Sequence, residues 1–261
     1  MSSASFLFLS PALPSELLTY ILNHHVYPTT LIICSSRSDF IAALANDVLQ
    51  NVTCPEAVPV EHGTETPPPG AALDAQGVDQ EQTRRKHRLL SSPLYQVATS
   101  RHIRVIYVPT VTHLRAYLSV FSPDDSKTPA PPANFNASGR HAPHIILYGF
   151  LEIHRDTSEW SAQGLGNSAS TLVELGHRSK WQTIIIEPQK HNSTNPFEDM
   201  LKESVPFLSG GGRKLGPDSE EGGWTGRTVE LGRVMKRWFH FRRGEWDIRS
   251  EDNEEISDKK G

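Results

Sequence analysis

Residues 144–150 form an almost unbroken apolar run, HIILYGF. A run of this length without polar alternation is typical of a strand that is buried on both faces of a parallel sheet. Three similar runs lie elsewhere in the chain: TLIIC at 30–34, IRVIYV at 103–108 and WQTIII at 181–186. Together the four runs predict four buried strands.

Segments with apolar residues at helical spacing separate these strands: residues 40–50, 112–121 and 161–177. A further helix is predicted over residues 14–23, before the first strand. Ser36 and Asp39 have the spacing of a capping box at the start of the helix over 40–50. Strands that alternate with helices predict an α/β fold with a mostly parallel sheet and helices on both faces.

The C-terminal part of the chain has a different pattern, RTVELGRVMKRWFHFRR over residues 227–243. Val229 and Leu231 alternate with polar neighbours, as do Phe239 and Phe241. Gly232 lies between the two alternating pairs, where a bulge or a bend is expected. We therefore expect C-terminal antiparallel strands added to the edge of the sheet.

Two segments break the alternation of strands and helices. Residues 51–83 contain five Pro, three Gly and six acidic residues without Lys or Arg, and a basic cluster at 84–88 follows. Residues 122–143 contain five more Pro. We expect a single domain over 1–249 with disordered or looped insertions at 51–88 and 122–143, and an acidic disordered tail at 250–261.

Composition excludes several classes of protein. The chain of 261 residues has 26 Lys and Arg against 30 Asp and Glu, a net charge of −4, so it is not a strongly basic nucleic-acid binder as a whole. Two cysteines cannot form a disulfide framework or a four-cysteine zinc site, which favours a reducing compartment. The apolar run Phe6–Leu9 is too short for a signal peptide or a membrane span, and no run reaches about 18 apolar residues.

Motifs for nucleotide chemistry are missing from the sequence. A Walker A loop needs a Gly-Lys pair, which the chain lacks, and a G-x-G-x-x-G motif is also absent. The loop after the strand over 30–34 supplies only Ser35, Ser36, Arg37 and Ser38, a degenerate phosphate loop that is not expected to bind. The strand over 144–150 presents Tyr148 where a magnesium-binding acid would be expected. We therefore expect no catalytic residue, no metal site and no cofactor.

The remaining signal is basic and aromatic. Between residues 225 and 243 there are six bases against one acid, with Trp238 and three further ring side chains interleaved. Cations mixed with aromatic faces suit single-stranded nucleic acid. An edge strand that is protected by charge and has its aromatic residues in the core would give the same pattern. The residues predicted to bind nucleic acid are Arg233, Lys236, Arg237, Trp238, Arg242 and Arg243.

Three segments resemble the RecA-like recombinase paralogs: HIILYGFLEIHRD, WQTIIIEP and WTGRTVELGRVMKRWFHFR. The likeness covers residues 29–50 and 100–243 and is closer to the small subunits of Shu-type complexes. It implies a non-catalytic nuclear subunit that binds a RecA-like paralog or a recombinase, and single-stranded DNA, without membrane contact. The ATPase-dead RecA-like subunits of Elongator, which act on tRNA, are similar to the same extent, and an α/β enzyme with an unrecognised site is the third alternative.

Overall fold

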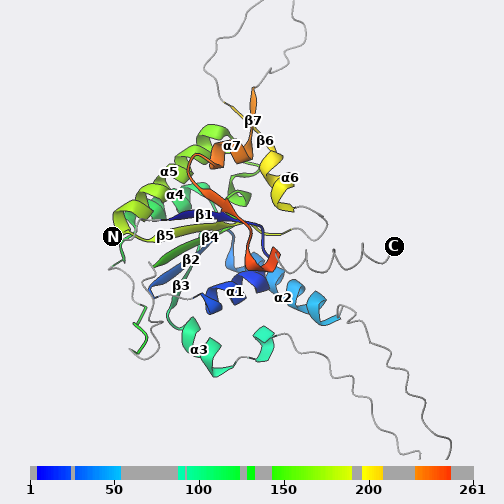
Figure 1. The fold of residues 1–261 in the computed structure, drawn as a ribbon, viewed down its shortest axis with the longest axis vertical. Coiled ribbons are helices and arrows are strands. Elements are labelled where there is room, and N and C mark those ends of the chain that lie inside the picture. Colours follow the sequence, from blue (N-terminus) through cyan, green and yellow to red (C-terminus); the bar gives the residue numbers. More distant parts are fainter. Residues whose placement is uncertain are drawn as a thin grey trace, which may run out of the picture.

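The structure is a computed structural model, and it describes residues 5–24, 27–53, 88–91, 93–123, 128–132, 143–189, 196–207 and 227–247. Its centre is a six-stranded sheet in the order β3-β2-β4-β5-β1-β8, in which each neighbouring pair is parallel (Figure 1). The strands are β1 (Phe6–Leu9), β2 (Thr29–Ile33), β3 (Ile103–Tyr107), β4 (His144–Tyr148), β5 (Gln182–Ile186) and β8 (His240–Arg242). The four strands predicted from apolar runs are thus confirmed.

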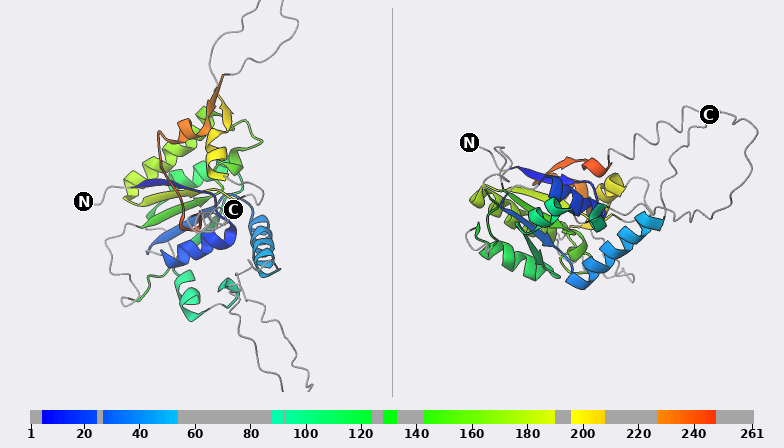
Figure 2. Two further views of the ribbon diagram at one scale, coloured as in Figure 1. Left: turned by 45° about the vertical axis from the view of Figure 1, so that its right-hand side comes forward. Right: turned by 90° about the horizontal axis from the view of Figure 1, so that it is seen from below.

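Helices cover both faces of this sheet, as predicted (Figure 2). On one face lie α1 (Pro14–Asn23) and α2 (Arg37–Thr53), and beyond them η1 (Arg88–Ser91) and α3 (Leu94–Ser100). On the other face lie α4 (Val111–Val120), α5 (Ala162–Ser179), α6 (Pro196–Lys202) and α7 (Leu231–Met235), with a 3₁₀ turn, η4 (Glu152–His154), after β4.

The core consists of two apolar clusters, one on each side of the sheet. Phe8, Ile145 and Leu147 face α4 and α5, whereas Leu7 and Ile146 face α1. Because successive side chains of a strand point to opposite faces, strands covered on both sides must be apolar at every position. This is why the runs show no alternation.

The C-terminal strands were predicted only in part. β7 (Thr228–Glu230) is antiparallel, as expected, but it pairs with β6 (Ser204–Pro206) in a separate two-stranded sheet. The strand at the sheet edge is β8, and it runs parallel to β1. Gly232 is not a bulge, because it lies in α7, where an ideal Cβ would be 3.0 Å from the carbonyl oxygen of Leu201 on α6. Through α7 the chain returns to the edge of the sheet at which the other strands begin. β8 starts from that edge and therefore runs parallel to β1.

The predicted insertions at 51–88 and 122–143 and the tail at 250–261 lie largely outside the described residues. At their margins, α2 continues through Thr53 and η1 begins at Arg88. A short piece of the second insertion is also described. There the Tyr27 hydroxyl donates a hydrogen bond to the Thr128 carbonyl at 2.9 Å, and His102 Nδ1 donates one to the Pro129 carbonyl at 2.7 Å.

No helix within the described ranges has the length and apolar character needed to cross a membrane.

Candidate functional site

The loop after β2 begins a capped helix. The Ser36 hydroxyl accepts a hydrogen bond from the Asp39 backbone N–H at 3.2 Å and lies 2.8 Å from the Ser38 hydroxyl. The Arg37 side chain is exposed, and Ser35 hydrogen-bonds locally to the Ser36 carbonyl. This geometry confirms the predicted cap.

A second strand–loop–helix unit, β1 followed by α1, was not predicted. Its helix begins in a loop without glycine, and two carboxylates of the chain occupy its N-terminus. Asp47 Oδ2 accepts from the Ser15 N–H and Glu16 Oε2 accepts from the Leu13 N–H, both at 2.8 Å. A helix N-terminus attracts anions through these N–H groups. A phosphate at this position would therefore face two carboxylates that are already bound.

Gly244 and Trp246 of the C-terminal segment form hydrogen bonds to the loop between β1 and α1. The Trp246 indole N–H donates to the Pro11 carbonyl at 2.8 Å, and the Gly244 N–H donates to the Ser10 hydroxyl at 2.8 Å. The ordinary place for a phosphate in a strand–loop–helix unit is thus filled by the protein itself.

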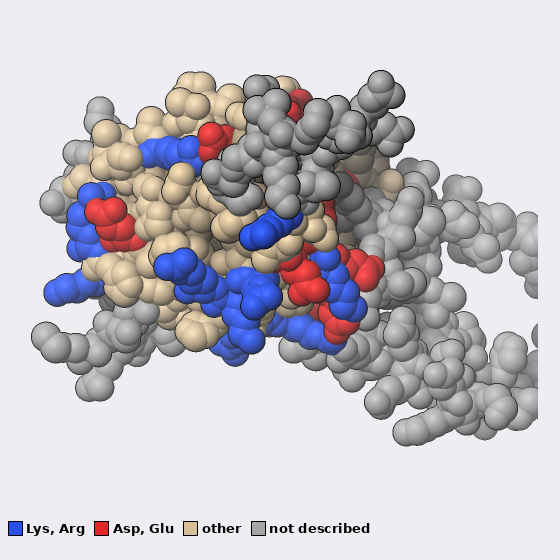
Figure 3. Space-filling model, turned by 90° about the horizontal axis from the view of Figure 1, so that it is seen from above, with Lys and Arg blue, Asp and Glu red and all other residues tan. Residues whose placement is uncertain are grey.

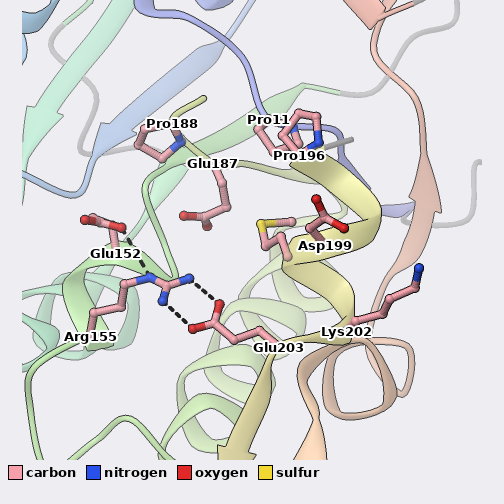
Figure 4. A pocket seen from close by; sticks show the side chains of 10 residues that line it. Pro11, Glu152, Arg155, Glu187, Pro188, Pro196, Asp199, Lys202 and Glu203 are labelled. Carbon is pink, nitrogen blue, oxygen red and sulfur yellow. Dashed lines mark hydrogen bonds and ion pairs between the residues drawn. The ribbon is translucent and has the colours of Figure 1, made fainter. Parts of the chain in front are cut away.

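A cavity of about 460 Å³ opens at the carboxyl ends of β1, β4 and β5 (Figure 4). Ligands of open α/β sheets bind at this edge, so this cavity is one candidate site. Four acidic and two basic side chains contribute to its wall. The lining residues are Pro11, Glu152, Arg155, Glu187, Pro188, Pro196, Asp199, Met200, Lys202 and Glu203.

Arg155 is held by acidic side chains of the same cavity. Its guanidinium forms two hydrogen bonds to Glu203, at 2.5 and 2.6 Å, and its Nε lies 3.3 Å from Glu152. The hydrogen bond to Glu203 raises the pKa of Arg155 above its ordinary value. The guanidinium also covers the ring of Trp160 at 4.5 Å, just before the N-cap of α5. A ligand phosphate would have to displace a bidentate carboxylate to reach this cation.

Glu187 directly follows β5 and points into the cavity between Glu152 and Asp199 (Figure 4). Only 4% of the residue is exposed, and its Oε1 accepts a hydrogen bond from the Leu151 N–H at 2.8 Å. Burial raises the pKa of Glu187 to about 8, and the backbone N–H of Leu151 opposes this shift. The carboxyl group is therefore largely uncharged at neutral pH. In the sequence, Glu187 was identified only as the end of a strand.

A second hollow, a groove of about 500 Å³, lies between α5 and α7. It brings together three of the residues predicted to bind nucleic acid: Arg233, Arg237 and Trp238. The Arg237 guanidinium lies 5.3 Å from the centre of the Trp238 ring. Phe207, at the end of β6, is 44% exposed and lines the same groove, although sequence reasoning missed it. The α5 wall consists of Ala162, Gln163, Gly166, Asn167 and Ser170, and Val229 and Val234 complete the lining.

The other three predicted residues do not line this groove. Lys236 is exposed at the C-cap of α7. Arg242 and Arg243 are exposed at the carboxyl end of β8, where the Arg242 carbonyl accepts from the Ser10 N–H. The residues predicted to bind nucleic acid therefore form two basic groups in the chain, one in and just after α7 and the other at the carboxyl end of β8. Figure 3 shows Lys and Arg side chains close together on the face seen from above, beside a group of mixed charge.

The aromatic residues of this segment were expected either to bind nucleic acid or to pack in the core behind an edge strand. Each explanation applies to some of them. Phe239 is buried in the core, and the Phe241 ring packs edge-on to Phe8 with ring centres 5.7 Å apart. These two residues follow the edge-strand explanation. Trp238 is partly exposed and belongs to the groove.

Within the described part of the chain, no group of three or more His, Cys, Asp and Glu could hold a metal ion.

Comparison with known proteins gives only weak structural likeness. No protein-family model and no curated protein matches the chain. One solved structure, described as a DnaB-like replicative helicase and its interactions with primase, is similar with a TM-score of 0.35 and 7% sequence identity. The match covers 72% of this chain and 40% of the helicase chain. A likeness at this level does not assign the chain to a family.

Proposed function

We propose that this chain is a non-catalytic subunit of a Shu-type, RecA-like recombination-accessory complex in the nucleus. In this role it binds single-stranded nucleic acid through Arg233, Arg237 and the neighbouring cations, and it binds a RecA-like paralog or a recombinase as a partner. The observation that carries the nucleic-acid part is the groove between α5 and α7, where two arginines and two partly exposed aromatic rings lie together.

The non-catalytic part of the proposal is supported by the unit of β1 and α1 and by the cavity at the carboxyl ends of the strands. The first helix N-terminus is occupied by Asp47 and Glu16, and the cavity cation Arg155 is bound by Glu203. Because Glu187 is largely uncharged, three carboxylates of the cavity, those of Glu152, Asp199 and Glu203, oppose its two cations. The wall therefore has no excess of positive charge with which to bind a nucleoside triphosphate.

An apolar surface supports the partner part of the proposal. A groove of about 630 Å³ lies between α1, α2, η1 and α3, and its wall consists mainly of Leu, Ile and Val side chains. Large exposed apolar patches on soluble domains mark sites of protein–protein interaction. The exposed large hydrophobic residues on this surface are Ile41, Leu49, Leu90, Leu94, Tyr95 and Val97.

We expect Mg-ATP to leave the melting temperature of the purified protein unchanged. A ligand at about 100 times its dissociation constant adds about 2.7 kcal/mol, which is roughly 5–10 °C for a domain of this size. Differential scanning fluorimetry measures the shift. An upward shift that is lost on Arg37→Ala would restore the loop after β2 as a phosphate site and contradict the non-catalytic assignment.

We expect single-stranded DNA or RNA to bind with strong salt dependence and little sequence preference. Four to five phosphate contacts give a log–log slope near −3, because each contact on a single strand contributes about −0.7. Fluorescence anisotropy of a labelled oligonucleotide over a range of NaCl concentrations measures this slope. The same titration with DNA and with tRNA distinguishes a recombination role from a tRNA role.

Two double variants test where the phosphates lie. Arg233→Ala/Arg237→Ala and Arg242→Ala/Arg243→Ala should each reduce the magnitude of the slope by about 1.4. The matched control is Arg37→Ala/Arg101→Ala, which removes the same charge from exposed positions on α2 and after α3. If all three doubles bind like the wild type, these four arginines are excluded as the phosphate contacts.

A further inference from the structure

Two glycines in the first turns of α5 have different surroundings. An ideal Cβ on Gly164 would lie 2.3 Å from the Glu159 carbonyl oxygen, so the packing of the chain requires glycine there. An ideal Cβ on Gly166 would meet nothing within 4 Å. Glycine is among the least favourable residues inside a helix. The described contacts of the chain therefore give no reason for glycine at position 166.

Gly166 lies on the wall of the groove between α5 and α7. The missing side chain leaves a bare stretch of helix backbone on the wall that Gln163, Asn167 and Ser170 also line. Glycine at such a position typically permits close approach of another group to the backbone. None of the described residues fills the space above Gly166, so the groove is open to a ligand at this position.

The opposite wall has the chemistry of a nucleotide site. Phe207 presents a partly exposed ring, and Arg237 is held over Trp238 with its guanidinium 5.3 Å from the ring centre. Arg233 lies one helical turn before Arg237 and lines the same groove. The volume of about 500 Å³ is in the usual range of small-ligand sites.

We propose that this groove holds one unpaired nucleotide of a single-stranded nucleic acid. The base stacks on Phe207 and passes over the bare backbone at Gly166, and the flanking phosphates contact Arg233 and Arg237. This inference rests on the proposed nucleic-acid function and names the site at which a base is read. Paired bases are already stacked inside a duplex, so the groove selects single strands.

The test uses the full chain with fluorescein-labelled oligo-dT, oligo-rU and a duplex of the same length. Gly166→Leu fills the groove and should weaken binding of oligo-dT or oligo-rU at least about tenfold while the salt slope stays the same, because the arginines remain. Phe207→Ala should weaken binding roughly 5- to 150-fold, as expected for the loss of one stacked base.

Gly166→Ala is the matched control, because a methyl group leaves most of the groove open. Both Gly166 variants should melt at or above the wild-type temperature, since each residue favours a helix more than glycine does. Binding of wild type and Gly166→Leu with equal affinity, or equal binding of the duplex, would overturn this inference and leave the proposed function intact. Failure of the wild type to bind any of the three probes would instead exclude the proposed function.

Discussion

Replacing Glu187 by Gln should remove most of the loss of stability that the wild type shows between about pH 5 and pH 8. Burial raises the pKa of Glu187 from its ordinary value of 4.5 to about 8, so the folded protein keeps a proton that the unfolded chain releases. The free energy of unfolding of the wild type therefore falls as pH rises through this range. The full loss is on the order of 5 kcal/mol, because a tenfold difference in proton affinity between the folded and unfolded states corresponds to about 1.4 kcal/mol, and roughly 3–4 kcal/mol of it falls between pH 5 and pH 8.

Gln resembles the neutral carboxyl group and can still accept the hydrogen bond from the Leu151 N–H. The measurement is urea unfolding of wild type and variant at several pH values from 5 to 9. Glu174→Gln is the control, because it makes the same substitution at an exposed position on α5. Parallel curves for wild type and Glu187→Gln would show that Glu187 is ionised at neutral pH, which its buried position opposes.

Replacing Phe8 by Ala should lower the free energy of unfolding by about 3–5 kcal/mol. Phe8 is completely buried in β1, and its ring packs against Phe197 of α6 and Phe241 of β8, with ring centres 6.3 and 5.7 Å apart. The variant should also lower the hydrogen-exchange protection of β8, since β1 is its partner in the sheet.

Chemical denaturation measures the loss of stability in this variant. The matched control is Phe207→Ala, which removes the same side chain from a position that is 44% exposed and should change stability by about 0.5 kcal/mol or less. Equal losses in the two variants would contradict the central place of β1 in the core.

The sheet was predictable where each strand is apolar at every position. In the run at 144–148, the only polar group after His144 is the Tyr148 hydroxyl. A strand with one solvent-exposed face would alternate with polar residues, and so the run predicts a strand that is buried on both faces. β1 was missed because its four residues were considered only as a possible membrane or signal segment. The order of the strands is set by packing between distant segments, which the local pattern of the sequence does not contain.

Three of the six residues predicted to bind nucleic acid line one groove, but helix geometry brings its two arginines together where strands were expected. Arg233 and Arg237 lie together because they are four residues apart across the end of a helix, whereas the sequence pattern predicted strands. Phe207 joins them only through the pairing of β6 with β7. The raised pKa of Glu187 depends on burial in the folded protein, so the sequence shows only an acid at the end of a strand.

The position of β1 has a consequence during synthesis of the chain. Leu7 pairs with Ile184 on one side and with His240 on the other, so the first strand finds its partners only after these distant residues have been synthesised. At about 5–20 residues per second, the wait for β5 alone is on the order of ten seconds. During that time the ribosome-bound chain carries an unpaired apolar strand, and pairings this distant in sequence also close slowly. A nascent chain that ends before residue 240 would present the open edge of β1 to other chains, so we expect it to be the species that chaperones retain or that aggregates.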